Sequence, residues 1–131
     1  MVIVDSTIWI HYLRTPDTPI SQELIKLLDN DEVAIIGPIL AEILQGARNE
    51  NGFLQLLNRL SALPYLEISK DTWVRAAQLS WKLKVQGRLT PLIDLLIAAV
   101  ALEGNHQVFT LDEHFQRVPG LRLYEIKGQV V

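Results

Sequence analysis

The chain has 131 residues, a net charge of −3 and a hydrophobic content of 49%, which predicts one domain over residues 1–131 and argues against disorder. It contains no cysteine, which excludes thiol catalysis, cysteine-based zinc sites and disulfide bonds. The first residues lack the positive region of a signal peptide, and no stretch is apolar enough over a sufficient length to span a membrane. A cytoplasmic location without membrane contact is therefore expected.

The opening stretch predicts a buried strand that ends at an acidic residue. Residues 2–4 are apolar and β-branched, which is typical of a strand buried on both faces of a sheet. Asp5 follows at the carboxyl end of this strand, where open α/β sheets bind ligands. Ser6 or Thr7 is predicted to cap the next helix, although Asp5 can also be interpreted as only a helix cap.

Apolar periodicity and turn residues divide the rest of the first half into alternating elements. In order, these are a loop at 14–19, a helix over 20–28, a strand at 33–36, a helix opened by Gly37-Pro38, a turn at 49–52, a helix over 53–60 and a short strand at 65–68. Glu23 is expected off the apolar face of its helix.

The second half continues the alternation of helices and strands. In order, its elements are a helix capped by Ser69 or Asp71 and ended by Gly87, an apolar helix with Thr90 as N-cap and Pro91 as first residue that ends at Gly104, a strand at 107–111 ending in Asp112, a helical turn at Phe115 and an edge strand at 121–126. Such alternation predicts an α/β fold: a three-layer α/β/α sandwich with a central parallel sheet and helices on both faces.

Four acidic residues interrupt or follow apolar segments. Asp5 and Asp112 each follow a predicted strand, so they emerge side by side if those strands are parallel neighbours. Asp94 lies in the first turn of an apolar helix, and Glu42 lies beside an apolar helix stripe. Taken singly, Asp94 can be only a favourable helix-dipole residue and Glu42 only a solvated one. Together, four carboxylates without buried basic partners indicate a divalent metal, and oxygen ligands favour Mg²⁺ or Mn²⁺. If the acids converge, at least one pKa should be raised.

Other chemistries find little support. The phosphate loop, the dinucleotide-binding glycine motif and the nucleophile elbow of serine hydrolases are all missing. Three scattered histidines, at positions 11, 106 and 114, are expected at the surface or with satisfied hydrogen bonds, and the tryptophans at 9, 73 and 81 are expected to pack in the core. A mild basic run, Lys82, Lys84 and Arg88, is either a solvated face or a guide for a phosphate backbone.

Four short motifs then occur in a fixed order: Val4-Asp5-Ser6-Thr7-x-Trp9, Ala41-Glu42-x-x-x-Gly46, Asp94-x-x-Ile97-Ala98-Ala99 and Thr110-x-Asp112-x-x-Phe115. The chain resembles the PIN-domain ribonucleases over essentially its whole length, and among them the VapC-type toxins of toxin–antitoxin pairs. The resemblance implies Mg²⁺- or Mn²⁺-dependent cleavage of single-stranded regions of RNA. It implies that Asp5, Glu42, Asp94 and Asp112 form the catalytic, metal-binding site. Ser6, Thr7 and Thr110 would be the hydroxyl residues that support it.

The resemblance also implies a cognate VapB-type antitoxin. Apolar residues of the first two helices, including Trp9, Tyr12 and Ile20, exceed what one small core needs, which predicts a homodimer and an antitoxin segment over nearby apolar surface. An antitoxin Arg or Lys could reach Asp5 or Asp94. Two alternatives remain open: a Mg²⁺-dependent phosphohydrolase or phosphotransfer domain with Asp5 as nucleophile, and a non-catalytic module whose acids bind a basic peptide.

Overall fold

A parallel four-stranded sheet forms the centre of the molecule, in the strand order β2-β1-β3-β4. The computed structural model describes residues 1–126, so residues 127–131 of the predicted domain lie outside the described part. The strands are β1 (Val2–Val4), β2 (Val33–Ala34), β3 (Gln107–Phe109) and β4 (Arg122–Leu123). In the register, Val4 of β1 lies opposite Phe109 of β3. The condition under which Asp5 and Asp112 were expected to emerge side by side, parallel pairing of the strands that precede them, is therefore met.

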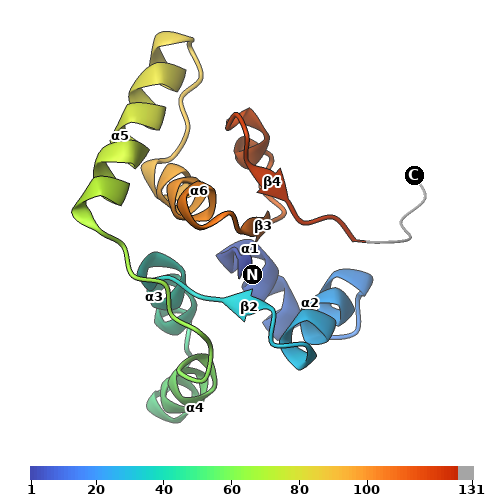
Figure 1. Cartoon of the computed structure of the whole chain (residues 1–131). Helices are drawn as coiled ribbons and strands as arrows, with labels where there is room; N and C mark the ends of the chain where they lie inside the picture. The colour runs from blue at the N-terminus through green and yellow to red at the C-terminus, as the bar shows by residue number, and fades with distance from the viewer. Residues whose placement is uncertain (127–131) are drawn as a thin grey trace.

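In the described part of the chain, six helices and one 3₁₀ helix surround the sheet and give the predicted three-layer α/β/α fold (Figure 1). Their bounds are α1 (Ser6–Arg14), α2 (Pro19–Asp29), α3 (Gly37–Gln45), α4 (Glu50–Leu60), α5 (Lys70–Val85), α6 (Leu92–Gly104) and η1 (Glu113–Arg117). Within residues 1–126, none of the helices has the length and hydropathy needed to cross a membrane.

Helix α6 is the buried element that the all-apolar pattern predicts. Every residue from Leu95 to Ala101 is buried, and the helix packs between α5 and strand β3. Because α6 is packed on all sides, its position and rotation are held by the close fit of its side chains against their neighbours. The first turn of α6, which carries Asp94, is thereby held at the carboxyl end of the sheet.

Several predicted boundaries were wrong for local reasons. The expected turn at 49–52 is the first turn of α4, because the side chain of Asn49 accepts a hydrogen bond from the Gly52 amide at 2.8 Å. The expected strand at 65–68 is reduced to a single bridge between Ile35 and Tyr65. The edge strand at 121–126 has only two paired residues, and the strands at 33–36 and 107–111 are also shorter than predicted.

The predicted helix caps were also partly wrong. Pro91, not Thr90, occupies the N-cap of α6, since the Thr90 hydroxyl donates to the Arg88 carbonyl at 3.3 Å instead. At α5 the predictions are confirmed: Ser69 caps the start, and Gly87 follows the end with a φ of 76°.

Three expectations about exposure were wrong. Trp9 is buried as predicted, but Trp73 and Trp81 on α5 are 46% and 66% exposed. Glu23, expected on a polar face, is only 8% exposed and accepts a hydrogen bond from the hydroxyl of Tyr124. The burial of Glu23 is possible because a donor from the distant end of the chain satisfies its carboxylate.

Candidate metal centre and active site

Asp5 lies at the carboxyl end of the central strand and is only 4% exposed. Its amide donates to the Phe109 carbonyl at 2.9 Å, which continues the pairing of β1 with β3 up to the site. The carboxylate accepts hydrogen bonds from the Ser6 amide at 2.8 Å, the Thr7 hydroxyl at 2.9 Å and the Thr110 hydroxyl at 2.8 Å. Asp5 is therefore the N-cap of α1, and the expectation that Ser6 or Thr7 caps this helix was wrong. Three donors compensate the burial of the charge.

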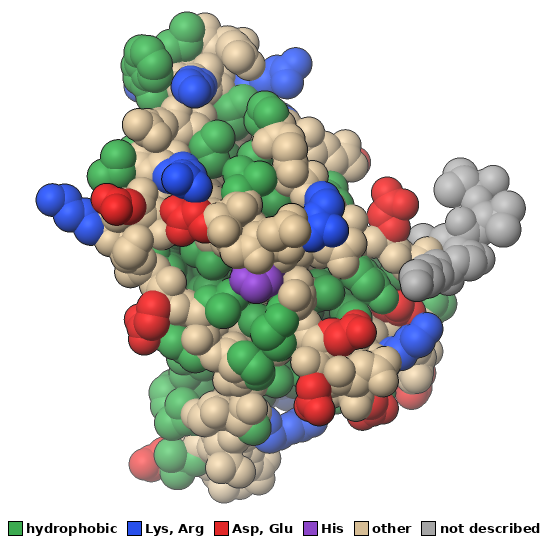
Figure 2. Space-filling model, in the orientation of Figure 1, with side chains coloured by type: hydrophobic (Ala, Val, Ile, Leu, Met, Phe, Trp, Pro, Cys, Tyr) green, Lys and Arg blue, Asp and Glu red, His purple; other side chains and the backbone are tan. Residues whose placement is uncertain are grey.

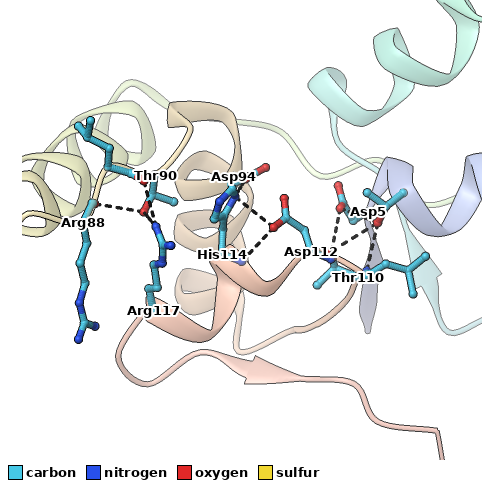
Figure 3. A network of polar contacts seen from close by, with 11 residues as sticks. Asp5, Arg88, Thr90, Asp94, Thr110, Asp112, His114 and Arg117 are labelled. Atoms are coloured by element: carbon cyan, nitrogen blue, oxygen red, sulfur yellow. Dashed lines mark hydrogen bonds and ion pairs between the residues drawn. The ribbon is translucent and has the colours of Figure 1, made fainter.

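Two threonine hydroxyls connect the end of β1 to the segment after β3. Thr110 bonds Asp5 and also accepts from the amide of Asp112 at 2.9 Å. Thr7 bonds Asp5 and also accepts from the amide of Leu111 at 3.2 Å. Both residues thus fix the backbone that leads to Asp112 relative to the carboxylate of Asp5 (Figure 3).

Asp94 and Asp112 converge on His114 beside Asp5 (Figure 3). Asp112 caps the 3₁₀ helix η1, because its Oδ1 accepts from the His114 amide at 2.9 Å. The Nδ1 atom of His114 lies 3.1 Å from Asp112 Oδ1 and 3.5 Å from Asp94 Oδ2. Asp94, Asp112 and His114 each offer one donor atom, and these atoms all lie within 4.8 Å of one another. Such a cluster has the size and the donor chemistry to hold one divalent cation.

The surroundings of Asp94 change its acidity. The pKa of Asp94 is raised from 3.8 to about 6, first because burial removes water from the carboxylate and then because the charges of Asp112 and Asp5 repel its own charge. His114 opposes this shift. The prediction that convergence raises at least one pKa is confirmed at this residue. A cation at the site would offset the repulsion that contributes to the raised pKa of Asp94.

Glu42 lies on the other side of Asp5, on helix α3. Its Oε2 accepts a hydrogen bond of 2.5 Å from the hydroxyl of Ser6, the residue that follows Asp5. Glu42 also lines a cleft of about 430 Å³ together with Arg14 and Arg48. The structure thus joins Glu42 to the site through Ser6, whereas the donor atoms that lie within 4.8 Å of one another belong to Asp94, Asp112 and His114.

His114 is the site residue that sequence reasoning missed. The histidines were expected at the surface or with satisfied hydrogen bonds. The Nδ1 atom of His114 is instead buried beside two carboxylates, and none of its contacts among residues 1–126 has hydrogen-bond geometry. Its spacing of two residues from Asp112 carries no metal-binding signature. Only the tertiary approach of Asp94, from a different helix, makes His114 part of a cluster.

Sequence and structure comparisons with known proteins identify the family to which this fold belongs. The sequence model of the family described as PIN domain matches residues 2–121, nearly the whole chain. This chain belongs to the PIN-domain family. Ribonuclease VapC11 of Mycobacterium tuberculosis is 28% identical over 119 residues, which cover 88% of this chain and 89% of the relative. Ribonuclease VapC18 of the same species is 27% identical over 122 residues, which cover 90% and 87%.

Solved structures of similar fold include VapBC2 from Rickettsia felis bound to a DNA fragment from its promoter. The match has a TM-score of 0.78 at 25% identity and covers 95% of this chain and 98% of that one. The DNA-bound VapBC of Salmonella typhimurium has a TM-score of 0.79 at 21% identity and covers 94% and 96%, which supports the PIN fold.

Proposed function

We propose that this PIN-domain protein is a metal-dependent endoribonuclease that cleaves single-stranded regions of RNA and acts as the toxin of a type II toxin–antitoxin pair. The observation that carries the proposal is the convergence of Asp94, Asp112 and His114 beside Asp5 at the carboxyl end of the sheet. The relatives named ribonuclease VapC and the VapBC complexes of similar fold support the same activity. The whole chain, residues 1–131, is proposed to form this single nuclease domain.

The residues at the site fit a divalent cation. Carboxylates dominate the donor set, and one buried nitrogen has no contact of hydrogen-bond geometry among the described residues. The pKa of Asp94 is raised first by burial and then by the negative charges of Asp112 and Asp5. We assign the binding of Mg²⁺ or Mn²⁺ to Asp5, Glu42, Asp94 and Asp112. When bound, such a cation activates water for attack on a phosphodiester and stabilises the charge that develops on the phosphate.

The protein's own hydroxyl groups position these acids. Thr7 and Thr110 both donate hydrogen bonds to Asp5 Oδ2 and thereby fix the orientation of its carboxylate. Ser6 holds Glu42 in the same way from the next position along the chain. The site is therefore largely formed before substrate arrives, and little reorganisation of the acids is required.

Arginine side chains near the acids are suited to RNA phosphates. Arg117 lies next to His114, and Arg88 lies farther out on the same side, away from Asp5 (Figure 3). Arg14 and Arg48 line the cleft beside Glu42. A strand that follows these arginines passes over the acidic cluster, so the net charge of −3 does not prevent RNA binding.

Two apolar surfaces suit protein partners. Helices α1, α3 and α4 enclose a small apolar pocket of about 100 Å³ against the buried Trp9. We assign this pocket to the apolar segment of a VapB-type antitoxin, whose Arg or Lys could reach the nearby acids. Tyr12 lines the pocket and Ile20 packs against the core, so these two residues and Trp9 offer less free surface than expected.

The second surface is the end of α5. Trp81, Val85 and Leu89 are 66%, 71% and 74% exposed there. Figure 2 shows hydrophobic side chains gathered at the upper tip of the molecule, over this end of the helix. We assign this surface, called the α5 tip below, to the interface of a homodimer.

The experiment compares cleavage of a structured RNA by wild-type protein, Asp5→Asn and Asp94→Asn, with Mn²⁺ or Mg²⁺ and with EDTA. We expect cleavage in single-stranded loops, inhibition by EDTA and a loss of several orders of magnitude in both variants. Asp17→Asn, at an exposed loop position, serves as the matched control and should retain activity.

Several results would contradict the proposal. Full activity of Asp5→Asn would disprove the assignment of this site. Turnover of a small phosphate monoester instead of RNA would favour the phosphohydrolase alternative. Absence of Mn²⁺ binding in calorimetry would favour a non-catalytic acidic binding module.

A further inference from the structure

We infer that His114 is a nitrogen ligand of the metal and that the site therefore selects Mn²⁺ and later first-row ions over Mg²⁺. This inference rests on the metal centre proposed above and goes beyond it, because the four assigned ligands are all carboxylates. It concerns the Nδ1 atom of His114, which lies between the carboxylates of Asp94 and Asp112 (Figure 3).

The spacing of the donor atoms fits a shared cation. Ligand atoms about 2.1 Å from a metal lie about 3 Å apart when they occupy adjacent positions of an octahedron and about 4.2 Å apart when they are opposite. Nδ1 is 3.1 Å from Asp112 Oδ1 and 3.5 Å from Asp94 Oδ2, close to the adjacent spacing. The donor atoms of all three residues lie within 4.8 Å of one another, so at most a small contraction brings them to these spacings.

The two nitrogens of the ring have different surroundings. Nδ1 is buried beside the carboxylates of Asp94 and Asp112, and none of its contacts in the described part of the chain has hydrogen-bond geometry. The side chain as a whole is 37% exposed, so the rest of the ring reaches solvent. When Nδ1 binds a cation, the ring carries its proton on Nε2, where water can accept the hydrogen bond.

The backbone holds the ring in this place. The His114 amide donates to Asp112 at 2.9 Å, and Phe115, the next residue, is only 1% exposed and anchors η1 in the core. Because Asp112 caps the same short helix, His114 and Asp112 are positioned as one unit. A ring that is fixed before the metal binds loses little conformational entropy on coordination.

A nitrogen ligand changes the order of metal preference. Mg²⁺ prefers oxygen ligands, whereas imidazole binds first-row transition ions with an affinity that rises from Mn²⁺ towards Cu²⁺. The alternative role for His114 is a purely structural one, in which the charged ring pairs with Asp94 and Asp112 and never contacts the metal. The two roles differ in a spectroscopic signature and in metal selectivity.

The test is pulsed electron paramagnetic resonance of bound Mn²⁺, which detects the coupling of a directly bound ¹⁴N nucleus, together with calorimetric titration of Mn²⁺ and Mg²⁺. We expect the ¹⁴N coupling in the wild type and its loss in His114→Ala and His114→Gln. The affinity for Mn²⁺ should fall by about 10-fold or more in both variants, because mutation of a residue that only supports a metal ligand already costs about 10-fold. The affinity for Mg²⁺ should change much less. His106→Gln is the matched control, because His106 precedes β3 and lies at the opposite edge of the sheet.

The possible outcomes separate this inference from the proposed function. Mn²⁺ that binds the wild type without ¹⁴N coupling would overturn the role of His114 and leave the carboxylate site intact. Equal loss of Mn²⁺ and Mg²⁺ affinity in the His114 variants would also overturn it, in favour of the structural role. Failure of the wild type to bind Mn²⁺ at all would overturn both proposals. The wild-type spectrum decides the question even if the variants fold poorly.

Discussion

Replacement of Asp94 by asparagine should stabilise the metal-free protein at neutral pH. The pKa of Asp94 rises from 3.8 to about 6 because of burial and of repulsion by Asp112 and Asp5. At 1.36 kcal/mol per pKa unit, this shift corresponds to about 3 kcal/mol of lost stability when the carboxylate is ionised. The side chain is 16% exposed, and partial screening by solvent reduces the expected gain to about 1–3 kcal/mol.

The sign of the pH dependence follows from the direction of the pKa shift. The folded state holds the proton of Asp94 more tightly than the unfolded state. The stability that protonated Asp94 gives the fold is therefore fully present below pH 3.8 and is lost as pH rises to about 6. The Asn side chain keeps the shape and never ionises. The difference in melting temperature between Asp94→Asn and the wild type should therefore grow across this range and stay constant above it.

The assay is a series of thermal unfolding curves with EDTA between pH 4 and pH 8, with Asp17→Asn as the exposed control. At pH 7 the variant should melt roughly 3–10 °C above the wild type. Excess Mn²⁺ should stabilise the wild type much more than the variant, because the metal binds only the folded state and Asp94 is one of its proposed ligands. A difference that does not change with pH, or equal metal-induced shifts in both proteins, would refute the reasoning.

Three further substitutions test other parts of the structure. Thr110→Val removes the donor to Asp5 and the acceptor for the Asp112 amide. Cleavage should therefore fall at least 10-fold, and the free energy of unfolding in denaturant should fall by about 1–3 kcal/mol. Unchanged activity would contradict the positioning role of Thr110. Trp81→Lys should dissociate the dimer in light scattering while circular dichroism stays unchanged, and a persistent dimer would exclude the α5 tip as its interface. Tyr124→Phe leaves the buried Glu23 without its donor and should cost about 1–3 kcal/mol in denaturant. The pKa of Tyr124 is raised to about 12 by burial and by Glu23, so the wild type should lose stability between pH 10 and pH 12, whereas Tyr124→Phe should lose less over this range.

The sequence predicted the parts of the site that depend on local pattern. The run of apolar residues at 2–4 predicted β1, and the apolar residues from Leu95 onward predicted a buried helix that carries Asp94. Alternation of strands and helices predicted a parallel sheet, which places Asp5 and the segment leading to Asp112 at the same edge. These features follow from the apolar periodicity, which a single sequence contains, and from the right-handedness of α/β connections, which is a general rule.

Features that depend on distant contacts could not be predicted. Periodicity places Trp73 and Trp81 on an apolar stripe of α5, but it does not tell whether another element of the same chain covers that stripe. The burial of Glu23 depends on a hydroxyl supplied by Tyr124, a hundred residues later. His114 belongs to the site only because Asp94 approaches from α6, and no spacing within the chain records that approach.

Asp5 and Asp94 are both largely buried, but the protein treats their charges differently. Asp5 accepts three hydrogen bonds, from an amide and two hydroxyl groups, so its burial is compensated without a cation. Asp94 faces Asp112 and His114 and has a raised pKa, so its charge is compensated only in part. The free energy available for metal binding is therefore concentrated at Asp94 and Asp112, while Asp5 provides a rigid reference point at the end of β1. This division explains why a substitution that stabilises the fold, Asp94→Asn, is expected to abolish the activity.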